Sequence, residues 1–107
     1  MPEHAVIVHV PLQGGDMGSP DEVRRLFVLE EQLEKAIRAA KVGEFDGNEF
    51  GGNECVFYMY GPDADTLFAA IQPVIAAVTP PRGAYAIKRY GSSDDPGARE
   101  ERVELAG

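Results

Sequence analysis

Residues 42–60 read VGEFDGNEFGGNECVFYMY, and this stretch decides the fold. It predicts two antiparallel strands joined by a Gly-Gly-Asn turn, because Gly and Asn tolerate the backbone angles that tight hairpins require. The second strand is apolar or aromatic on both of its faces, so we expect it in the middle of a sheet. In the first strand Phe45 and Phe50 have opposite parity, and a bulge near Gly47-Asn48 would bring both rings to one side.

A strand and a long helix are predicted before this hairpin. Residues 4–12, HAVIVHVPL, are rich in β-branched side chains and end in a strand-breaking proline. A capping box at Ser19 and Glu22, with Pro20 in the first turn, predicts the start of a helix that runs to about Lys41. The apolar residues at helical spacing predict its buried face. They are Val23, Leu26, Phe27, Leu33, Ile37 and Ala40.

A second helix and one or two strands are predicted after the hairpin. Asp63 or Asp65 would cap the helix, and its apolar phase continues across Pro73, so we expect a bend there with the proline on the outer side. Residues 84–90 predict another strand. Residues 99–105 alternate enough for an extra C-terminal edge strand, with a short helix as the alternative.

The order β-α-β-β-α-β predicts an α+β protein, a ferredoxin-like plait formed by residues 1–107 as a single domain. One antiparallel sheet would carry two helices on one face, with residues 5–10 and 54–60 as its central strands. We expect the row Val6, Val8 and Val10 to face the helices, because that choice leaves His9 on the other side.

The other face of the sheet would then be open, apolar and aromatic. Monomers rarely expose such a surface without a use. We favour a homodimer formed by sheet-to-sheet packing; a small ligand between subunits, or cover from the C-terminal segment, are the alternatives. The candidate pocket or dimer residues are His9, Val56, Tyr58, Tyr60, Tyr85 and Arg89.

Charge excludes several classes of partner. The chain has 107 residues, 18 Asp and Glu against 10 Lys and Arg, and a formal net charge of −8. This balance repels phosphate backbones and favours a basic protein partner, so we predict no nucleic acid. We expect no membrane segment, because no apolar run approaches the roughly 20 residues that span a bilayer. With no secretory signal pattern, we expect a cytoplasmic protein.

The hairpin concentrates carboxylates at its edge and turn. The candidate partner-binding residues are Glu44, Asp46, Asn48, Glu49 and Glu54. Their spacing does not fit a calcium-binding EF-hand loop, because Phe50 and Phe57 stand where oxygen ligands belong. We therefore predict no metal, no cofactor and no catalytic residue.

Two histidines and one cysteine are the remaining reactive side chains. His4 is expected to be exposed near the N-terminus. His9 is expected to be a packing residue of the open face, although a His and Tyr in an interface pocket could transfer protons. Cys55 has apolar neighbours and is expected to be a buried, inert thiol that can form no disulfide within the chain.

Glu44-Phe45-Asp46-Gly47 resembles the Glu-Tyr-Asp-Gly segment of the bacterial ribonuclease E inhibitor B family. The resemblance covers these four residues, and Asn48 stands where an aromatic residue tends to follow in that family. It implies a small acidic ferredoxin-like module that binds a basic enzyme. The predicted function is therefore a non-enzymatic interaction or regulatory module for a basic partner protein. The alternative is a dimeric domain that binds or acts on a small molecule at the open sheet face.

Overall fold

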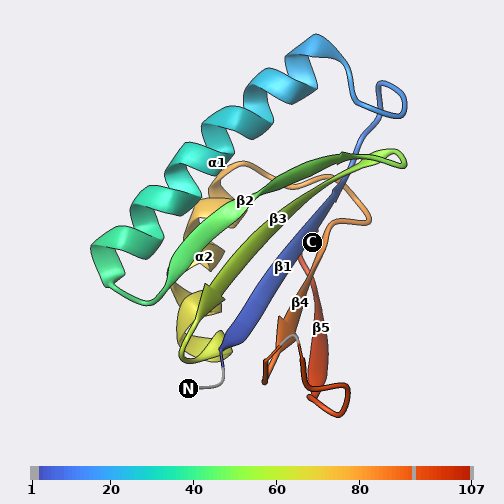
Figure 1. Ribbon diagram of the computed structural model, residues 1–107. Coiled ribbons are helices and arrows are strands. Elements are labelled where there is room, and N and C mark those ends of the chain that lie inside the picture. Colours follow the sequence, from blue (N-terminus) through green and yellow to red (C-terminus); the bar gives the residue numbers. More distant parts are fainter. Residues whose placement is uncertain (1–2, 93, 107) are drawn as a thin grey trace.

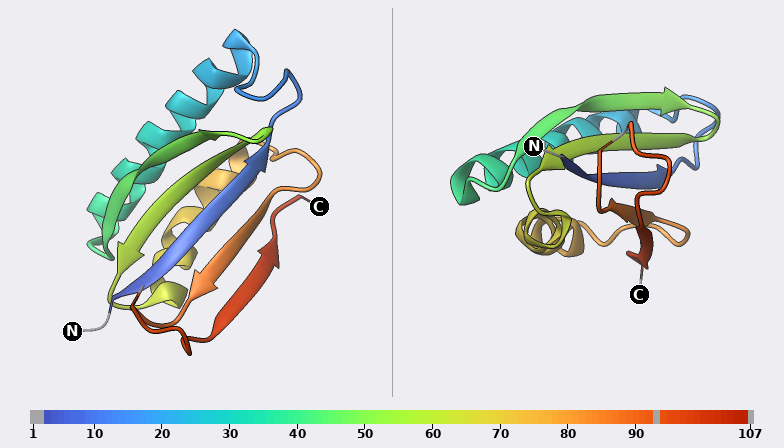
Figure 2. Two further views of the ribbon diagram at one scale, coloured as in Figure 1. Left: turned by 45° about the vertical axis from the view of Figure 1, so that its right-hand side comes forward. Right: turned by 60° about the horizontal axis from the view of Figure 1, so that its bottom comes forward.

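Five strands form one antiparallel sheet, and two helices lie together on one of its faces (Figures 1 and 2). The computed structural model describes residues 3–92 and 94–106. The elements are β1 His4–Pro11, α1 Pro20–Ala40, β2 Glu44–Gly51, β3 Glu54–Gly61, α2 Ala64–Ala77, β4 Tyr85–Arg89 and β5 Glu100–Glu104. The strand order is β2-β3-β1-β4-β5. The predicted α+β class, antiparallel sheet and two helices are confirmed, and the C-terminal segment forms an edge strand rather than the alternative helix.

α1 begins as the sequence predicts. The Ser19 side chain accepts a hydrogen bond from the Glu22 amide, and the Glu22 carboxylate accepts one from the Ser19 amide. The helix ends at Lys41, which adopts a left-handed conformation with φ 56°.

The buried stripe of α1 differs from the prediction. It consists of Leu26, Leu29, Leu33 and Ile37. Phe27 was placed in it but is 47% exposed, because successive helical residues are about 100° apart and Phe27 follows Leu26 directly. Ala40, at the end of the helix, is exposed as well. The correct stripe is therefore narrower than the sequence suggested.

The hairpin turn uses Gly52 and Asn53, with φ angles of 61° and 65°. Two successive positive angles are typical of the tight turn that matches strand twist. The bulge lies at Asp46, one residue before the expected position, and it lets Phe45 and Phe50 face the helices together. β3 lies between β2 and β1, as its two apolar faces predicted.

α2 is capped by Asp63, whose side chain accepts a hydrogen bond from the Asp65 amide. The helix continues through Pro73, which is exposed as predicted. It stops at Ala77, and Thr79 then takes a left-handed conformation with φ 50° before Pro80. The chain therefore leaves the helix at a sharp angle.

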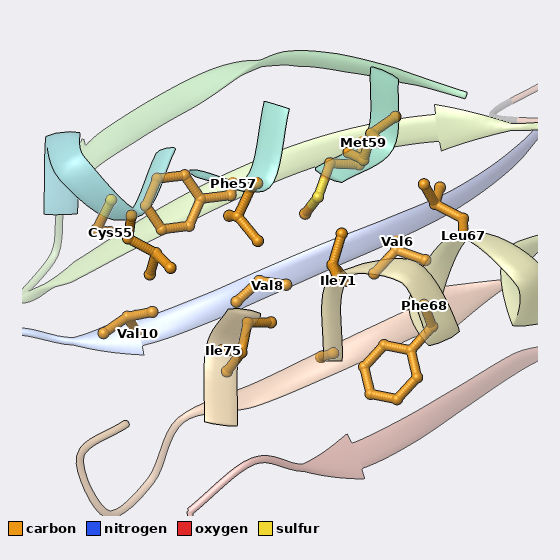
Figure 3. Packing of buried hydrophobic residues seen from close by; sticks show 14 of the residues in the cluster. Val6, Val8, Val10, Cys55, Phe57, Met59, Leu67, Phe68, Ile71 and Ile75 are labelled. Carbon is orange, nitrogen blue, oxygen red and sulfur yellow. The ribbon is translucent and has the colours of Figure 1, made fainter. Parts of the chain in front are cut away.

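The core lies between the helices and one face of the sheet (Figure 3). Val6, Val8 and Val10 point into it, as predicted. The largest fully buried side chains come from both strands and helices: Phe57, Leu33, Ile37, Met59, Leu67 and Ile71. Cys55 is also fully buried, and burial, together with the charges of Glu30 and Glu54, raises the pKa of its thiol to about 12. The thiol is therefore protonated and shielded.

Candidate functional site

The β2 edge of the sheet carries three exposed carboxylates. Glu44 and Glu49 lie opposite Tyr60 and Val56 in register, so they stand on the open side of the sheet. Asp46 occupies the bulge at the outer rim. In the described parts of the chain, none of these three carboxylates lies within 4 Å of a basic group. Their charges are therefore available to a partner.

The other two candidate partner-binding residues are held by contacts within the chain. Asn48 lies opposite Phe57, so its side chain points to the helix side, where it donates a hydrogen bond to Glu30 of α1. The Glu54 carboxylate lies 2.8 Å from Nδ1 of His9. The structure thus groups Glu44, Asp46 and Glu49 at the edge, turns Asn48 to the opposite face of the sheet and pairs Glu54, which shares the open face, with His9.

An apolar hollow, which the sequence analysis missed, borders this edge. Phe27 and Met17 are 47% and 56% exposed, and the Phe27 ring lies 5.9 Å from the ring of Phe50. The hollow is lined by Met17, Gly18, Pro20, Val23, Arg24, Phe27 and Phe50. Glu30 follows Phe27 by one turn of α1, so apolar and acidic surfaces adjoin. The sequence could have indicated this hollow, because Phe27 lies one position away from the buried stripe that includes Leu26 and Leu33.

The open face of the sheet contains all six residues predicted for it. Across three strands, Tyr58, Ile7 and Ile87 form one row, and Val56, His9 and Tyr85 form the next. Ile7, Tyr58 and Ile87 are partly exposed, and no described element covers them. This face is apolar at its centre, as predicted.

The polar groups of the open face are paired with one another. The His9 and Tyr85 rings are stacked, with centroids 4.5 Å apart and planes 8° from parallel. On the other side of Tyr85, the Arg102 guanidinium lies 3.7 Å from the ring centroid. With Glu54 bonded to His9, these four side chains form a continuous layer across the sheet. That layer favours a packing role for His9.

Arg89 holds the connection between β4 and β5. Its guanidinium donates to the Glu100 carboxylate at 2.8 Å, to the Ser92 carbonyl at 3.2 Å and to the Asp95 carbonyl. Its side chain is only 17% exposed. These contacts occupy the terminal nitrogens of Arg89, which the sequence analysis assigned to a pocket or dimer face. The Phe27 hollow and the groove between α1 and α2 both lie elsewhere, on the helix side.

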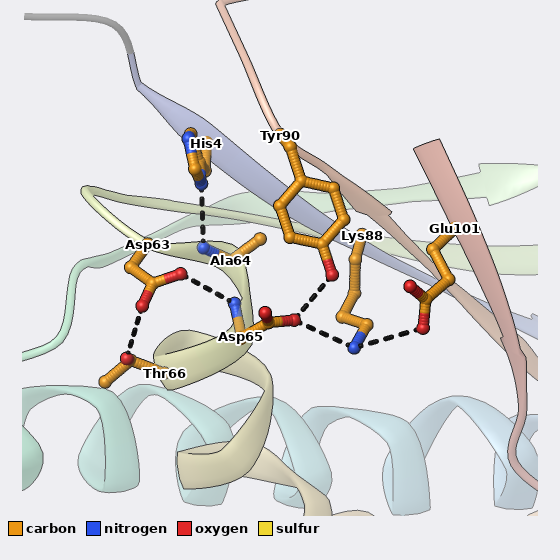
Figure 4. Close-up of polar contacts among 8 residues, drawn as sticks. All are labelled: His4, Asp63, Ala64, Asp65, Thr66, Lys88, Tyr90 and Glu101. Atoms are coloured by element: carbon orange, nitrogen blue, oxygen red, sulfur yellow. Dashed lines mark hydrogen bonds and ion pairs between the residues drawn. The ribbon is translucent and has the colours of Figure 1, made fainter. Parts of the chain in front are cut away.

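A polar cluster joins α2 to β4 and β5 (Figure 4). Lys88, 13% exposed, lies 3.0 Å from the Asp65 carboxylate and 3.4 Å from that of Glu101. Tyr90 donates its hydroxyl hydrogen to Asp65. The hydrogen bonds from Tyr90 and Lys88 lower the pKa of Asp65, and the bond to Asp65 raises the pKa of Lys88. The cluster therefore anchors the helix start to the sheet.

His4 was expected to be exposed, and this expectation is wrong. Its Nδ1 accepts a hydrogen bond of 3.0 Å from the Ala64 amide, and its ring packs edge-on against Tyr90. The side chain is half-buried because β1 begins beside the start of α2. It is a second acceptor at that helix terminus, beside Asp63.

Residues 3–92 and 94–106 contain no group of three or more His, Cys, Asp or Glu arranged to hold a metal ion. In the same ranges, neither helix has the length and hydropathy needed to cross a bilayer.

Comparison with known proteins adds no relative. A scan against models of protein families, a search of curated proteins and a search of solved structures each found no match. The functional interpretation therefore rests on the residues themselves.

Proposed function

We propose that the chain is a non-enzymatic protein-interaction module that docks its β2 edge on a basic partner protein. The observation that carries this proposal is the set Glu44, Asp46 and Glu49, exposed along one edge strand with no basic group of the described chain within 4 Å. Residues 42–81 contain six carboxylates and no Lys, Arg or His. Among the described residues, two of these six carboxylates, Glu54 and Asp65, are paired with a basic side chain from elsewhere in the chain.

The surface combines a charged rim with an apolar anchor point. Interfaces gain most of their affinity from buried aromatic contacts, while surrounding charges set the encounter rate and orientation. Phe27 and Phe50 supply an aromatic pair beside the edge. The partner would straddle β2, with an apolar side chain in the Phe27 hollow and Lys or Arg near Glu44 and Glu49.

Contact through side chains is more favourable here than addition of a strand. The bulge at Asp46 twists the edge and interrupts its row of backbone groups. Acidic side chains along an edge also oppose pairing with another strand. A basic, globular partner fits this edge better than an extended acidic or neutral peptide.

We further propose that the fold is a ferredoxin-like plait extended by β5. The chain order β-α-β-β-α-β and the central position of β1 and β3 support it. A plait with an acidic edge is also the architecture implied by the resemblance of Glu44-Phe45-Asp46-Gly47 to the ribonuclease E inhibitor B family.

Charge-neutralising variants test the docking proposal. The edge variant is Glu44→Gln/Asp46→Asn/Glu49→Gln, and the control variant is Glu3→Gln/Asp94→Asn/Glu104→Gln, which changes the net charge equally. A basic protein captured by the wild-type chain is purified, and its affinity for the three proteins is measured by calorimetry over a salt series. We expect weaker binding by the edge variant only, with a reduced salt slope. Equal affinity of the edge variant and the control would contradict the proposal.

A second candidate function uses the open sheet face, as a homodimer interface or a small-molecule site between two copies. The observation that favours it is the uncovered row of Tyr58, Ile7 and Ile87. Sedimentation of the wild type and Tyr58→Glu distinguishes this candidate. A wild-type dimer that the variant converts to monomer supports it, and a wild-type monomer at high concentration removes it.

A further inference from the structure

A groove lies between the two helices. It has a volume of about 840 Å³, within the range of small-molecule sites. One wall is the first half of α1, and the other is the end of α2 with Thr79, Pro80 and Pro81. Val8 and Val10 of β1 lie beneath the groove, 0% and 7% exposed, and Leu105 also lines it.

The groove exists because no side chain of α1 or α2 fills the space between the first half of α1 and the end of α2. Leu26 and Leu29 of α1 point toward α2, but Ile75 is the last buried residue that α2 contributes before the chain turns away. Val28 and Val78 at the rim remain 54% and 45% exposed. Large exposed aliphatic side chains on both rims would gain contacts from an apolar occupant.

Among the described residues, one cation at the mouth of the groove has no ionic partner. Arg24 is paired with Asp21. The Glu22 carboxylate accepts hydrogen bonds from the amides of Gln13, Gly14 and Ser19, so it is turned into the adjoining loop. Arg25 forms no ion pair with any described residue. In a chain of net charge −8, this is a local site where an anion is favoured.

We propose that this groove binds an amphipathic carboxylate: a molecule with an aliphatic chain and one anionic head. The chain would lie between Val28 and Val78 above the valines of β1, and the head would lie at Arg25. A guanidinium can hold a carboxylate through two parallel hydrogen bonds.

A peptide helix fits the groove less well than an aliphatic chain. The axes of packed helices lie about 8–10 Å apart, which is less than the diameter of about 10–12 Å of a helix with its side chains. A third helix could therefore lie only on top of the furrow between two packed helices. Val8 and Val10 beneath the groove are already 0% and 7% exposed, so the occupant lies over them without entering the core. The site is separate from the β2 edge, and the proposed protein docking does not depend on it.

The test uses decanoate, decanol and decyltrimethylammonium, which share a chain length and differ in head charge. Binding is followed by amide chemical shifts, with affinities from titration. We expect saturable binding of decanoate with shifts at Val28, Val78 and Leu105. Arg25→Gln should weaken decanoate about tenfold and leave decanol unchanged, because one charge-assisted contact is lost. Arg38→Gln, on the same helix and outside the groove, is the matched control.

Several outcomes would overturn the proposal. They are no saturable binding of decanoate, equal affinity for the cationic probe, an equal effect of Arg38→Gln, or shifts that map to the Phe27 hollow instead. Movement of the groove amides with protein concentration alone would assign the groove to a second copy of the chain. Arg25 is exposed, so its substitution tests the site without threatening the core.

Discussion

Nδ1 of His4 accepts a hydrogen bond from the amide of Ala64, the first residue of α2, and so joins the start of β1 to the start of a helix 60 positions later. An unsatisfied amide at a helix start costs free energy comparable to a lost cap. His4→Phe retains an aromatic ring and removes the acceptor. We expect it to lower the free energy of unfolding by about 1 kcal/mol in urea titrations. His9→Phe, at a stacked position without such a cap, is the comparison. Unchanged stability of His4→Phe would show that the cap is dispensable.

Glu22 makes stability depend on pH. Hydrogen bonds from the backbone of Gln13, Ser19 and Gly14 lower its pKa in the folded state. A carboxyl with a lowered folded pKa contributes stability above its unfolded pKa, and the contribution is lost as pH falls through the folded value. We expect Glu22→Gln to unfold at lower temperature near neutral pH and to lose less on acidification. Parallel melting-temperature curves from neutral pH to pH 3 for variant and wild type would contradict this role.

Gly14 is required by the same loop. A Cβ on Gly14 would lie 2.6 Å from Oε1 of Glu22 and 2.6 Å from the Ser19 nitrogen. Gly14→Ala must therefore displace the Glu22 carboxylate from the backbone amides from which it accepts hydrogen bonds. A Cβ on Gly15 meets no atom within 4 Å, although the φ of 104° at this residue adds backbone strain. We expect the Gly14 variant to lose the pH dependence attributed to Glu22 and the Gly15 variant to keep it. Thermal melts at two pH values measure the difference.

Cys55 should be inert in the folded protein. Its side chain is fully buried and its pKa is raised to about 12, so almost no thiolate exists at pH 8. We expect one thiol to react with Ellman's reagent in denaturant and none to react promptly without it. Prompt labelling of native protein would place Cys55 at the surface.

Truncation of two phenylalanines should change stability by very different amounts. Phe57 is fully buried, and Phe57→Ala should cost about 3–5 kcal/mol of unfolding free energy. Phe27 is 47% exposed, and Phe27→Ala should change stability by less than about 1 kcal/mol. Urea titration of both variants provides the comparison. A large loss for Phe27→Ala would show that its contact with Phe50 supports the fold.

Local patterns predicted most of the architecture. The capping box at Ser19 indicated where α1 begins, and the apolar residues on both faces of β3 indicated that this strand lies inside the sheet. The helical phase through Pro73 identified one continuous helix because a proline on the outer side leaves the buried stripe intact. Phe45 and Phe50 indicated a bulge through their parity, although only the backbone located it at Asp46.

Contacts between distant segments limited the prediction of the site. His4 was predicted to be exposed because no residue near it in the sequence indicates its hydrogen bond with the amide of Ala64. Glu54 and Asn48 looked like parts of the acidic rim until strand register placed one beside His9 and the other beside Glu30. The groove was missed because it depends on where α2 ends relative to α1, a distance that no single helix pattern contains.

The central position of β1 determines when the sheet can be completed. Ala5 pairs with Tyr60 on one side and with Arg89 on the other, 55 and 84 residues later. Contacts this far apart in sequence are slow to form, and during synthesis β1 cannot pair on its second side until residues 85–89 have followed β3. The valine-rich strand β1 thus waits longest for its second partner strand. We expect chaperones that act during translation to bind mainly to this segment.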